Sequence, residues 1–310
     1  MPVKKKFVYA AAVIAAIIII LPLPFVRRDI PLDTLKLKYA NDQSRFMTID
    51  GMPVHYRDEG KGFPVVLVHG TSSSLHTWDG WTAELVKKYR VIRMDLPAFG
   101  LTGPNASGDY TVRAYVKFLD EFLSKLELGK FHIAGNSLGG LICWNYALTH
   151  PGKVDRMILV DSAGYPVAKV PALFRMLNIA PLSFIGRCIT PRFLVEKNLR
   201  EVYGDDSKIT EALIDRYYDM ALREGNRRAL IDRVRTPRDY DETLTKLGTI
   251  QSPTLIMWGS DDYWIPLDNA RNFNRDIPGS KLVVYEGVGH VPMEEIPEKT
   301  VSDAIRFLGK

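Results

Sequence analysis

The chain has 310 residues, of which 46% are apolar and 25% are charged, and its formal net charge is +5. This length is enough for one large domain or two small ones with a substantial core. Much of the positive excess sits in the first 28 residues, which argues against nucleic acid as a partner. The two cysteines, Cys143 and Cys188, are too few for a disulfide framework.

An uncharged run extends from Phe7 to Val26, between three lysines and the pair Arg27-Arg28. As a helix, this run would match the ~30 Å hydrocarbon core of a bilayer. A cleaved signal peptide is the competing interpretation, but its apolar region is typically about 7–15 residues long and ends at a small-residue cleavage site. We therefore predict an N-terminal membrane anchor over residues 1–28 and a linker over 29–44. Lysines at the N-terminus slightly favour an extracytoplasmic (periplasmic) location for the rest of this single-pass protein.

The following segments alternate between strand-like and helix-like patterns. Residues 46–49 and 54–57 flank Asp50-Gly51, which predicts a β-hairpin. Continuous apolar runs predict buried strands at 64–68, 90–96, 131–134 and 156–161. Between them, apolar residues at helical spacing predict helices at 75–89 and 111–128. This order predicts an α/β fold with a mostly parallel central sheet and helices on both faces.

The alternation stops after Gly164. From about 165 to 247 the chain lacks apolar strand runs and has helical segments separated by prolines. Strands are expected again at 253–258 and 281–285, and helices at 267–275 and 297–308. A helical insertion between two strands of one sheet is typical of a cap, so we predict one domain over 45–310 with a helical cap over about 165–247.

A Gly-x-Ser-x-Gly pentapeptide, Gly135-Asn-Ser-Leu-Gly139, joins the strand at 131–134 to a helix-like run. A serine hydroxyl is a poor nucleophile unless a tight turn presents it beside a base, and small flanking residues permit such a turn. The same turn places the amide of Leu138 at a helix N-terminus, where it can stabilise an oxyanion. Ser137 is therefore the candidate nucleophile.

Two later segments supply candidates for the base and for the acid that orients it. Asp261 and Asp262 follow the strand at 253–258, and His290 lies in a glycine-rich loop after the next strand. Because chemistry in parallel α/β sheets collects at the carboxyl ends of the strands, these side chains are expected near Ser137. Either aspartate, or Asp161 at the end of the preceding strand, can be the acid.

With His69-Gly70, these motifs resemble the α/β-hydrolase superfamily over about residues 46–310. The resemblance implies an α/β-hydrolase fold and a triad of Ser137, Asp262 and His290, with no cofactor and no metal. It assigns the oxyanion hole to the backbone amides of Thr71 and Leu138, and to His69 a role in shaping the oxyanion loop. The family usually has glycine where this chain has Ala98, so this position departs from the family pattern.

The apolar segment at 170–185, together with Trp78, Trp81, Phe99 and Trp264, suggests an apolar pocket. We predict a membrane-anchored carboxylesterase or lipase-like serine hydrolase for small apolar esters, including lipid-derived ones. Alternatives within the superfamily are a carbon–carbon bond hydrolase, a cofactor-free perhydrolase or acyltransferase, and a non-enzymatic small-molecule receptor. The carbon–carbon hydrolases usually carry Gly-Ser-Gly-Pro-Gly where this chain has 70–74, and tryptophan where it has Val291. The sequence does not determine the oligomeric state.

Overall fold

A computed structural model of the protein describes residues 26–167, 171–237 and 239–309. Its framework is one eight-stranded sheet in the order β1-β2-β4-β3-β5-β6-β7-β8. The strands are β1 (Ser44–Ile49), β2 (Met52–Gly60), β3 (Pro64–Val68), β4 (Arg90–Met94), β5 (Phe131–Asn136), β6 (Val154–Val160), β7 (Thr254–Gly259) and β8 (Lys281–Tyr285).

The sheet is mostly parallel, as predicted. β1 and β2 form the expected antiparallel hairpin, and β2 is also antiparallel to β4, whereas all other neighbouring strands are parallel. At the hairpin turn, Asp50 and Gly51 have φ values of 46° and 77°, which suit the right-handed twist of the flanking strands. Every residue of β5 and β7 is buried, as expected for strands covered on both faces.

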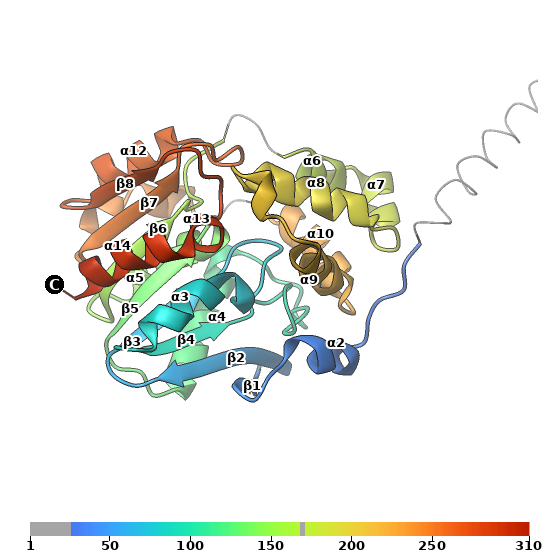
Figure 1. Ribbon diagram of the computed structural model, residues 1–310, viewed down its shortest axis with the longest axis horizontal. Helices are drawn as coiled ribbons and strands as arrows, with labels where there is room; N and C mark the ends of the chain where they lie inside the picture. The colour runs from blue at the N-terminus through green and yellow to red at the C-terminus, as the bar shows by residue number, and fades with distance from the viewer. Residues whose placement is uncertain (1–25, 168–170, 238, 310) are drawn as a thin grey trace, which may run out of the picture.

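Helices cover both faces of the sheet. α3 (Asp79–Leu85) packs against α14 (Pro297–Leu308) in front of the strands in Figure 1. On the opposite face α4 (Val112–Lys125) packs against α5 (Leu138–Thr149), and α12 (Asp268–Asp276) lies against β7 and β8. Fully buried side chains from the strands and these helices form one continuous core.

Between β6 and β7 the described residues form helices and no strand. The helices are α6 (Ala172–Asn178), α7 (Ala180–Gly186), α8 (Arg192–Val202), α9 (Glu211–Leu222), α10 (Asn226–Arg235) and α11 (Asp241–Leu244), with short 3₁₀ turns η3 (Asp206–Lys208) and η4 (Leu247–Thr249). Figure 1 shows α6 to α10 gathered beside one end of the sheet, and we refer to these five as the cap helices.

The segment 29–44, which we interpreted as a linker, contains helix α2 (Leu32–Tyr39). Lys38 Nζ and Tyr39 Oη both donate to Asp219 Oδ2 on α9, each over 2.7 Å. The backbone of Ile30 also donates to the carbonyl of Leu222. This part of the chain is therefore packed against the cap.

The predicted membrane anchor lies outside the described residues, apart from its last few positions. The longest helix in the described part of the chain is α4, with 14 residues. A helix of that length spans about 21 Å, short of the ~30 Å hydrocarbon core. None of the described helices is long and apolar enough to cross a bilayer. The prediction of a single-pass membrane protein with an extracytoplasmic domain is corrected by this finding.

Candidate active site

Ser137 lies in a sharp turn between β5 and α5. Its φ of 53° and ψ of −116° fall in a region that non-glycine residues rarely adopt, at a cost of about 1–3 kcal/mol. The turn fits only because its neighbours are small: a Cβ on Gly139 would lie 2.1 Å from the carbonyl oxygen of Val68. The glycines of the pentapeptide thus allow the helix to approach the sheet and hold Ser137 at its edge.

Asp262 and His290 form a buried pair at the same edge. Asp262 Oδ2 lies 2.7 Å from His290 Nδ1, and Oδ1 accepts hydrogen bonds from the amides of Trp264 and Ile265 at 2.8 and 2.9 Å. A carboxylate can only accept, so His290 carries its proton on Nδ1 and leaves Nε2 with a lone pair. Asp261 is exposed, and the structure brings Asp262, not Asp261, to the histidine.

Ser137 and His290 line one small pocket of about 20 Å³, together with Thr71. His290 Nε2 is buried and has no hydrogen-bond partner in the described part of the chain, so the serine–histidine bond is not formed in this structure. Hydrogen bonds of this kind are often long without substrate and tighten in the Michaelis complex. The arrangement brings the candidate nucleophile, base and orienting acid together at the ends of three strands.

The two expected oxyanion donors lie on either side of Ser137 in the fold. Thr71 follows β3, and Leu138 begins α5; neither amide donates a hydrogen bond to another described residue. His69 shapes this loop as expected: its Nδ1 donates to the carbonyl of Gly70 at 2.7 Å, and its Nε2 accepts from the Leu96 amide at 2.9 Å. Burial lowers the pKa of His69, so its ring is neutral.

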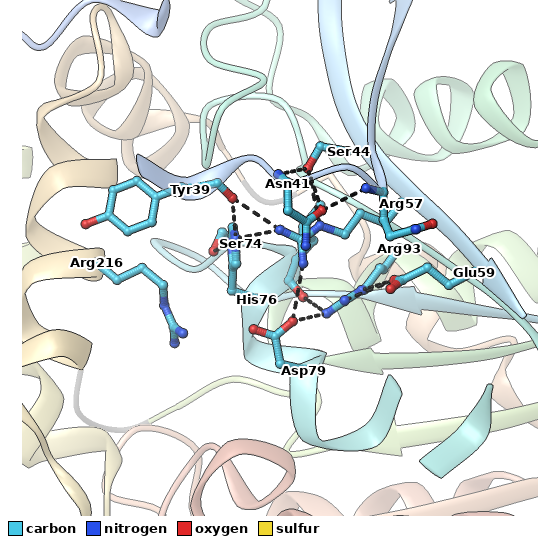
Figure 2. Close-up of polar contacts among 12 residues, drawn as sticks. Tyr39, Asn41, Ser44, Arg57, Glu59, Ser74, His76, Asp79, Arg93 and Arg216 are labelled. Atoms are coloured by element: carbon cyan, nitrogen blue, oxygen red, sulfur yellow. Dashed lines mark hydrogen bonds and ion pairs between the residues drawn. The ribbon is translucent and has the colours of Figure 1, made fainter. Parts of the chain in front are cut away.

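A buried ionic network supports the loop that follows Thr71 (Figure 2). Arg93 donates to Glu59 at 3.0 Å, to Asp79, and to the carbonyl of Leu75 in η2 (Leu75–Trp78). Arg57 lies 3.2 Å from His76 Nε2, and burial lowers the pKa of His76 to about 4. Each buried charge has a partner, so we interpret this network as structural.

Asp95 connects the same loop to the segment that follows β4. Its Oδ1 accepts from the Leu75 amide at 2.7 Å, and its Oδ2 lies 2.8 Å from His55 Nδ1. Burial alone would raise the pKa of Asp95, but His55 outweighs it and holds that pKa well below its usual range. Ala98 adopts a φ of 82°, the left-handed conformation that glycine favours. Ala98 therefore has the backbone conformation that a glycine at this position would favour.

A cavity of about 240 Å³ lies under the cap helices. Its wall is mostly apolar and comes from α6, α7, α8, α9, α10 and the loop at 98–100. The cavity shares four lining residues with the pocket around Ser137: Ser72, Ser73, Asn198 and Tyr217. An apolar chamber therefore adjoins the candidate nucleophile.

The four aromatic residues expected at the pocket have different positions. Phe99 lines the cavity, and Trp264 lines the Ser137 pocket, with its ring centroid 5.5 Å from that of His290. Trp78 and Trp81 are instead fully buried in the core, where Trp81 donates to Thr300. For these two tryptophans the expectation of a pocket role was wrong.

A family model described as the α/β hydrolase fold matches residues 64–297, most of the described chain. The protein belongs to the α/β-hydrolase family. It is 30% identical over 257 residues to the uncharacterised hydrolase YugF of Bacillus subtilis, covering 82% of this chain and 93% of YugF.

Two other similar proteins carry more specific names. This hydrolase is 28% identical over 275 residues to a 2-hydroxy-6-oxo-6-(2'-aminophenyl)hexa-2,4-dienoic acid hydrolase of Metapseudomonas resinovorans, covering 86% of this chain and 91% of the relative. Among solved structures, a putative lipase from Acinetobacter baumannii AYE aligns with a TM-score of 0.74 at 26% identity, covering 91% of this chain and 97% of the lipase.

Asn136 is a residue of the hydrolase site that sequence reasoning passed over. Its side-chain amide donates to the carbonyls of Val160 and His290, at 3.2 and 3.0 Å. The amide of His290 in turn donates to the carbonyl of Val202, at the end of α8, over 2.7 Å. The histidine loop is thus fixed both to the turn around Ser137 and to the cap. The position of Asn136 next to the nucleophile was the available signal.

Proposed function

We propose that this hydrolase cleaves carboxylic esters of apolar acids through an acyl-enzyme formed on Ser137. The observation that carries the proposal is the apolar cavity of about 240 Å³ that adjoins the pocket of Ser137 and His290. An acyl chain in this cavity would bring its carbonyl carbon to the serine. Burial of that chain supplies binding energy of about 0.8 kcal/mol for each buried CH₂ group.

In the proposed mechanism, His290 Nε2 takes the proton of Ser137 as its oxygen attacks the ester carbonyl. Asp262 holds Nδ1–H and stabilises the imidazolium that forms. The amides of Thr71 and Leu138 donate to the developing oxyanion, and losing one such donor typically costs about 10²–10³ in rate. His290 then returns the proton to the leaving alcohol, and water hydrolyses the acyl-enzyme by the same steps.

The test is fluorophosphonate labelling followed by a series of p-nitrophenyl esters of increasing acyl length. We expect the full-length protein to be labelled, Ser137→Ala to remain unlabelled and inactive, and kcat/KM to peak at a medium or long acyl chain. Ser124→Ala, an exposed serine of α4, is the matched control and should behave as the unmodified protein. Absence of labelling in the unmodified protein would contradict the proposal and favour a small-molecule receptor.

Carbon–carbon bond hydrolysis is the second candidate, because the Metapseudomonas resinovorans relative is named as a dienoic acid hydrolase. Two features of this chain count against it: serine and threonine occupy positions 71–74, and Val291 follows the histidine. Turnover of a 2-hydroxy-6-oxo-dienoic acid with no turnover of any p-nitrophenyl ester would replace the first proposal with this one.

A further inference from the structure

Asp161 is a buried acid next to the Asp262–His290 pair. It follows directly after β6, is fully buried and has a φ of 43°. Its amide donates to the carbonyl of Met257, and its Oδ1 accepts from the Gly259 amide, each at 3.0 Å. These two bonds to β7 hold the carboxyl group in one place. Its other oxygen, Oδ2, is enclosed and has no hydrogen-bond partner among the described residues.

The carboxyl group belongs to a compact cluster. One oxygen from Asp161, one from Asp262 and one nitrogen of His290 lie within 4.8 Å of one another. Three such atoms could in principle hold a cation. However, Asp262 Oδ1 accepts two amides, and its Oδ2 faces the Nδ1–H of His290, so these atoms are already engaged. We therefore treat the cluster as two acids that share one histidine.

The number of hydrogen-bond donors differs among the buried acids around His290. Asp262 accepts from two amides and the histidine ring, and Glu295 accepts from the amides of Gly204, Asp205 and Gly289. Within the described ranges of the chain, Asp161 accepts a hydrogen bond from one amide only, that of Gly259. Donors stabilise the ionised form of a carboxyl group, so Asp161 is the acid least suited to carry a charge.

The electrostatic surroundings of Asp161 act in the same direction. Burial, and then the negative charge of Asp262, raise the pKa of Asp161 well above its usual range, and Glu295 adds to this. On β8, Tyr285 faces the group and is neutral, because burial raises its pKa above the ordinary value. No arginine or lysine of the described chain is among the groups that act on the Asp161 carboxyl. Two carboxylates this close resist simultaneous ionisation.

We propose that Asp161 keeps its proton at neutral pH and donates a hydrogen bond from its unpaired carboxyl oxygen to the Asp262 carboxylate. It is a positioning residue, because it acts on His290 only through Asp262. The hydrogen bond spreads the charge of Asp262 and limits how strongly that carboxylate stabilises protonated His290. The pH at which the base becomes available to Ser137 is thereby lowered. This kinetic consequence rests on the proposed function, whereas the protonation state does not.

The first test is infrared spectroscopy of the full-length protein at pH 7. We expect the carbonyl absorption of a protonated carboxylic acid, its loss in Asp161→Asn and in Asp161→Leu, and its retention in Asp155→Asn. Asp155 is the matched control, since it lies on β6 near the opposite end and is partly exposed. A spectrum of the unmodified protein without this absorption would overturn the proposal, even if every variant failed to fold.

The second test is the pH dependence of kcat/KM. The acidic limb of this profile is the fall in kcat/KM at low pH, where His290 becomes protonated. Asp161→Asn still offers an N–H to Asp262 and should leave the midpoint of that limb unchanged. Asp161→Leu offers no donor, so its acidic limb should move up by about one pH unit, and kcat/KM should fall by about fivefold at the original midpoint. If Asp161 were ionised, both variants would remove an anion beside the base and move the limb to lower pH, which would contradict the proposal. Lack of turnover in the unmodified protein would count against the proposed function alone.

Discussion

Asp262→Asn is the substitution for which the structure makes the sharpest prediction. Asparagine has nearly the shape of aspartate, but one of its oxygens becomes an NH₂ group. The amides of Trp264 and Ile265 both donate to Oδ1, so the asparagine oxygen must stay there and the NH₂ group must face His290. His290 Nδ1 would then have to accept a hydrogen bond, and its proton would move to Nε2.

This change of tautomer removes the base without moving it. With a proton on Nε2, His290 cannot take the proton of Ser137, although the site keeps its shape. In a serine–histidine–aspartate triad this substitution lowers kcat by about 10⁴-fold, which corresponds to roughly 5 kcal/mol of transition-state stabilisation. Since the apolar cavity is untouched, KM should change little.

The assay is steady-state hydrolysis of the best p-nitrophenyl ester from the chain-length series, with the folded state checked by circular dichroism. Asp261→Asn is the matched control, because the same substitution is made one residue away, on an exposed side chain bonded to Ser260. It should retain normal kcat. A folded Asp262→Asn protein that loses less than about tenfold in kcat would refute the assignment of Asp262 as the orienting acid.

Three further predictions concern stability and reactivity. Phe273→Ala should lower the free energy of unfolding by about 3–5 kcal/mol, because this fully buried ring packs against three aromatic side chains. Chemical denaturation measures the effect, and the control Tyr263→Ala, at a residue that is 62% exposed, should change that free energy by less than about 0.5 kcal/mol. In the native protein a thiol reagent should modify only the exposed Cys188 of the two cysteines. Cys143 should react only after unfolding, because it is buried and burial raises its pKa. Modification of both cysteines in the native state would contradict this prediction. Burial lowers the pKa of His132 to about 4, below the value of about 6.5 in an unfolded chain. The unfolded state therefore binds more protons between these values, and the free energy of unfolding should fall as the pH drops from about 6.5 to 4. In denaturation curves measured across this range His132→Phe should reduce that fall, and an unchanged fall would show that other groups cause it.

The local features of this hydrolase were predictable from its sequence. The turn around Ser137 depends on residues within a few positions of one another, and the glycines that permit it are visible in the pentapeptide. The β-hairpin at Asp50-Gly51 and the buried strands depend on short patterns of the same kind. Family resemblance then added the order of nucleophile, acid and base along the chain.

The tertiary structure gave the physical basis for choices between neighbouring residues. Family resemblance favoured Asp262 over the adjacent, chemically identical Asp261, and the turn after β7 buries Asp262 beside His290 and exposes Asp261. Trp78 and Trp81 were expected at the pocket because they follow a strand end, but they point into the core. Side-chain direction in such loops depends on packing partners that lie far away in the sequence.

The sequence by itself therefore determined the fold class, the strained turn at Ser137 and a short set of candidates for the acid and base. The resemblance already favoured Asp262 over Asp261, and the tertiary structure supplied the physical basis, the buried contact of Asp262 with His290. Only the tertiary structure decided that Tyr217 and Asn198 lie between the Ser137 pocket and the cap cavity, and that Asp161 shares a buried cluster with Asp262. The physical reason is that hydrogen bonds and charge interactions act over a few ångströms, and the residues that come this close here are separated by tens to more than a hundred positions along the chain.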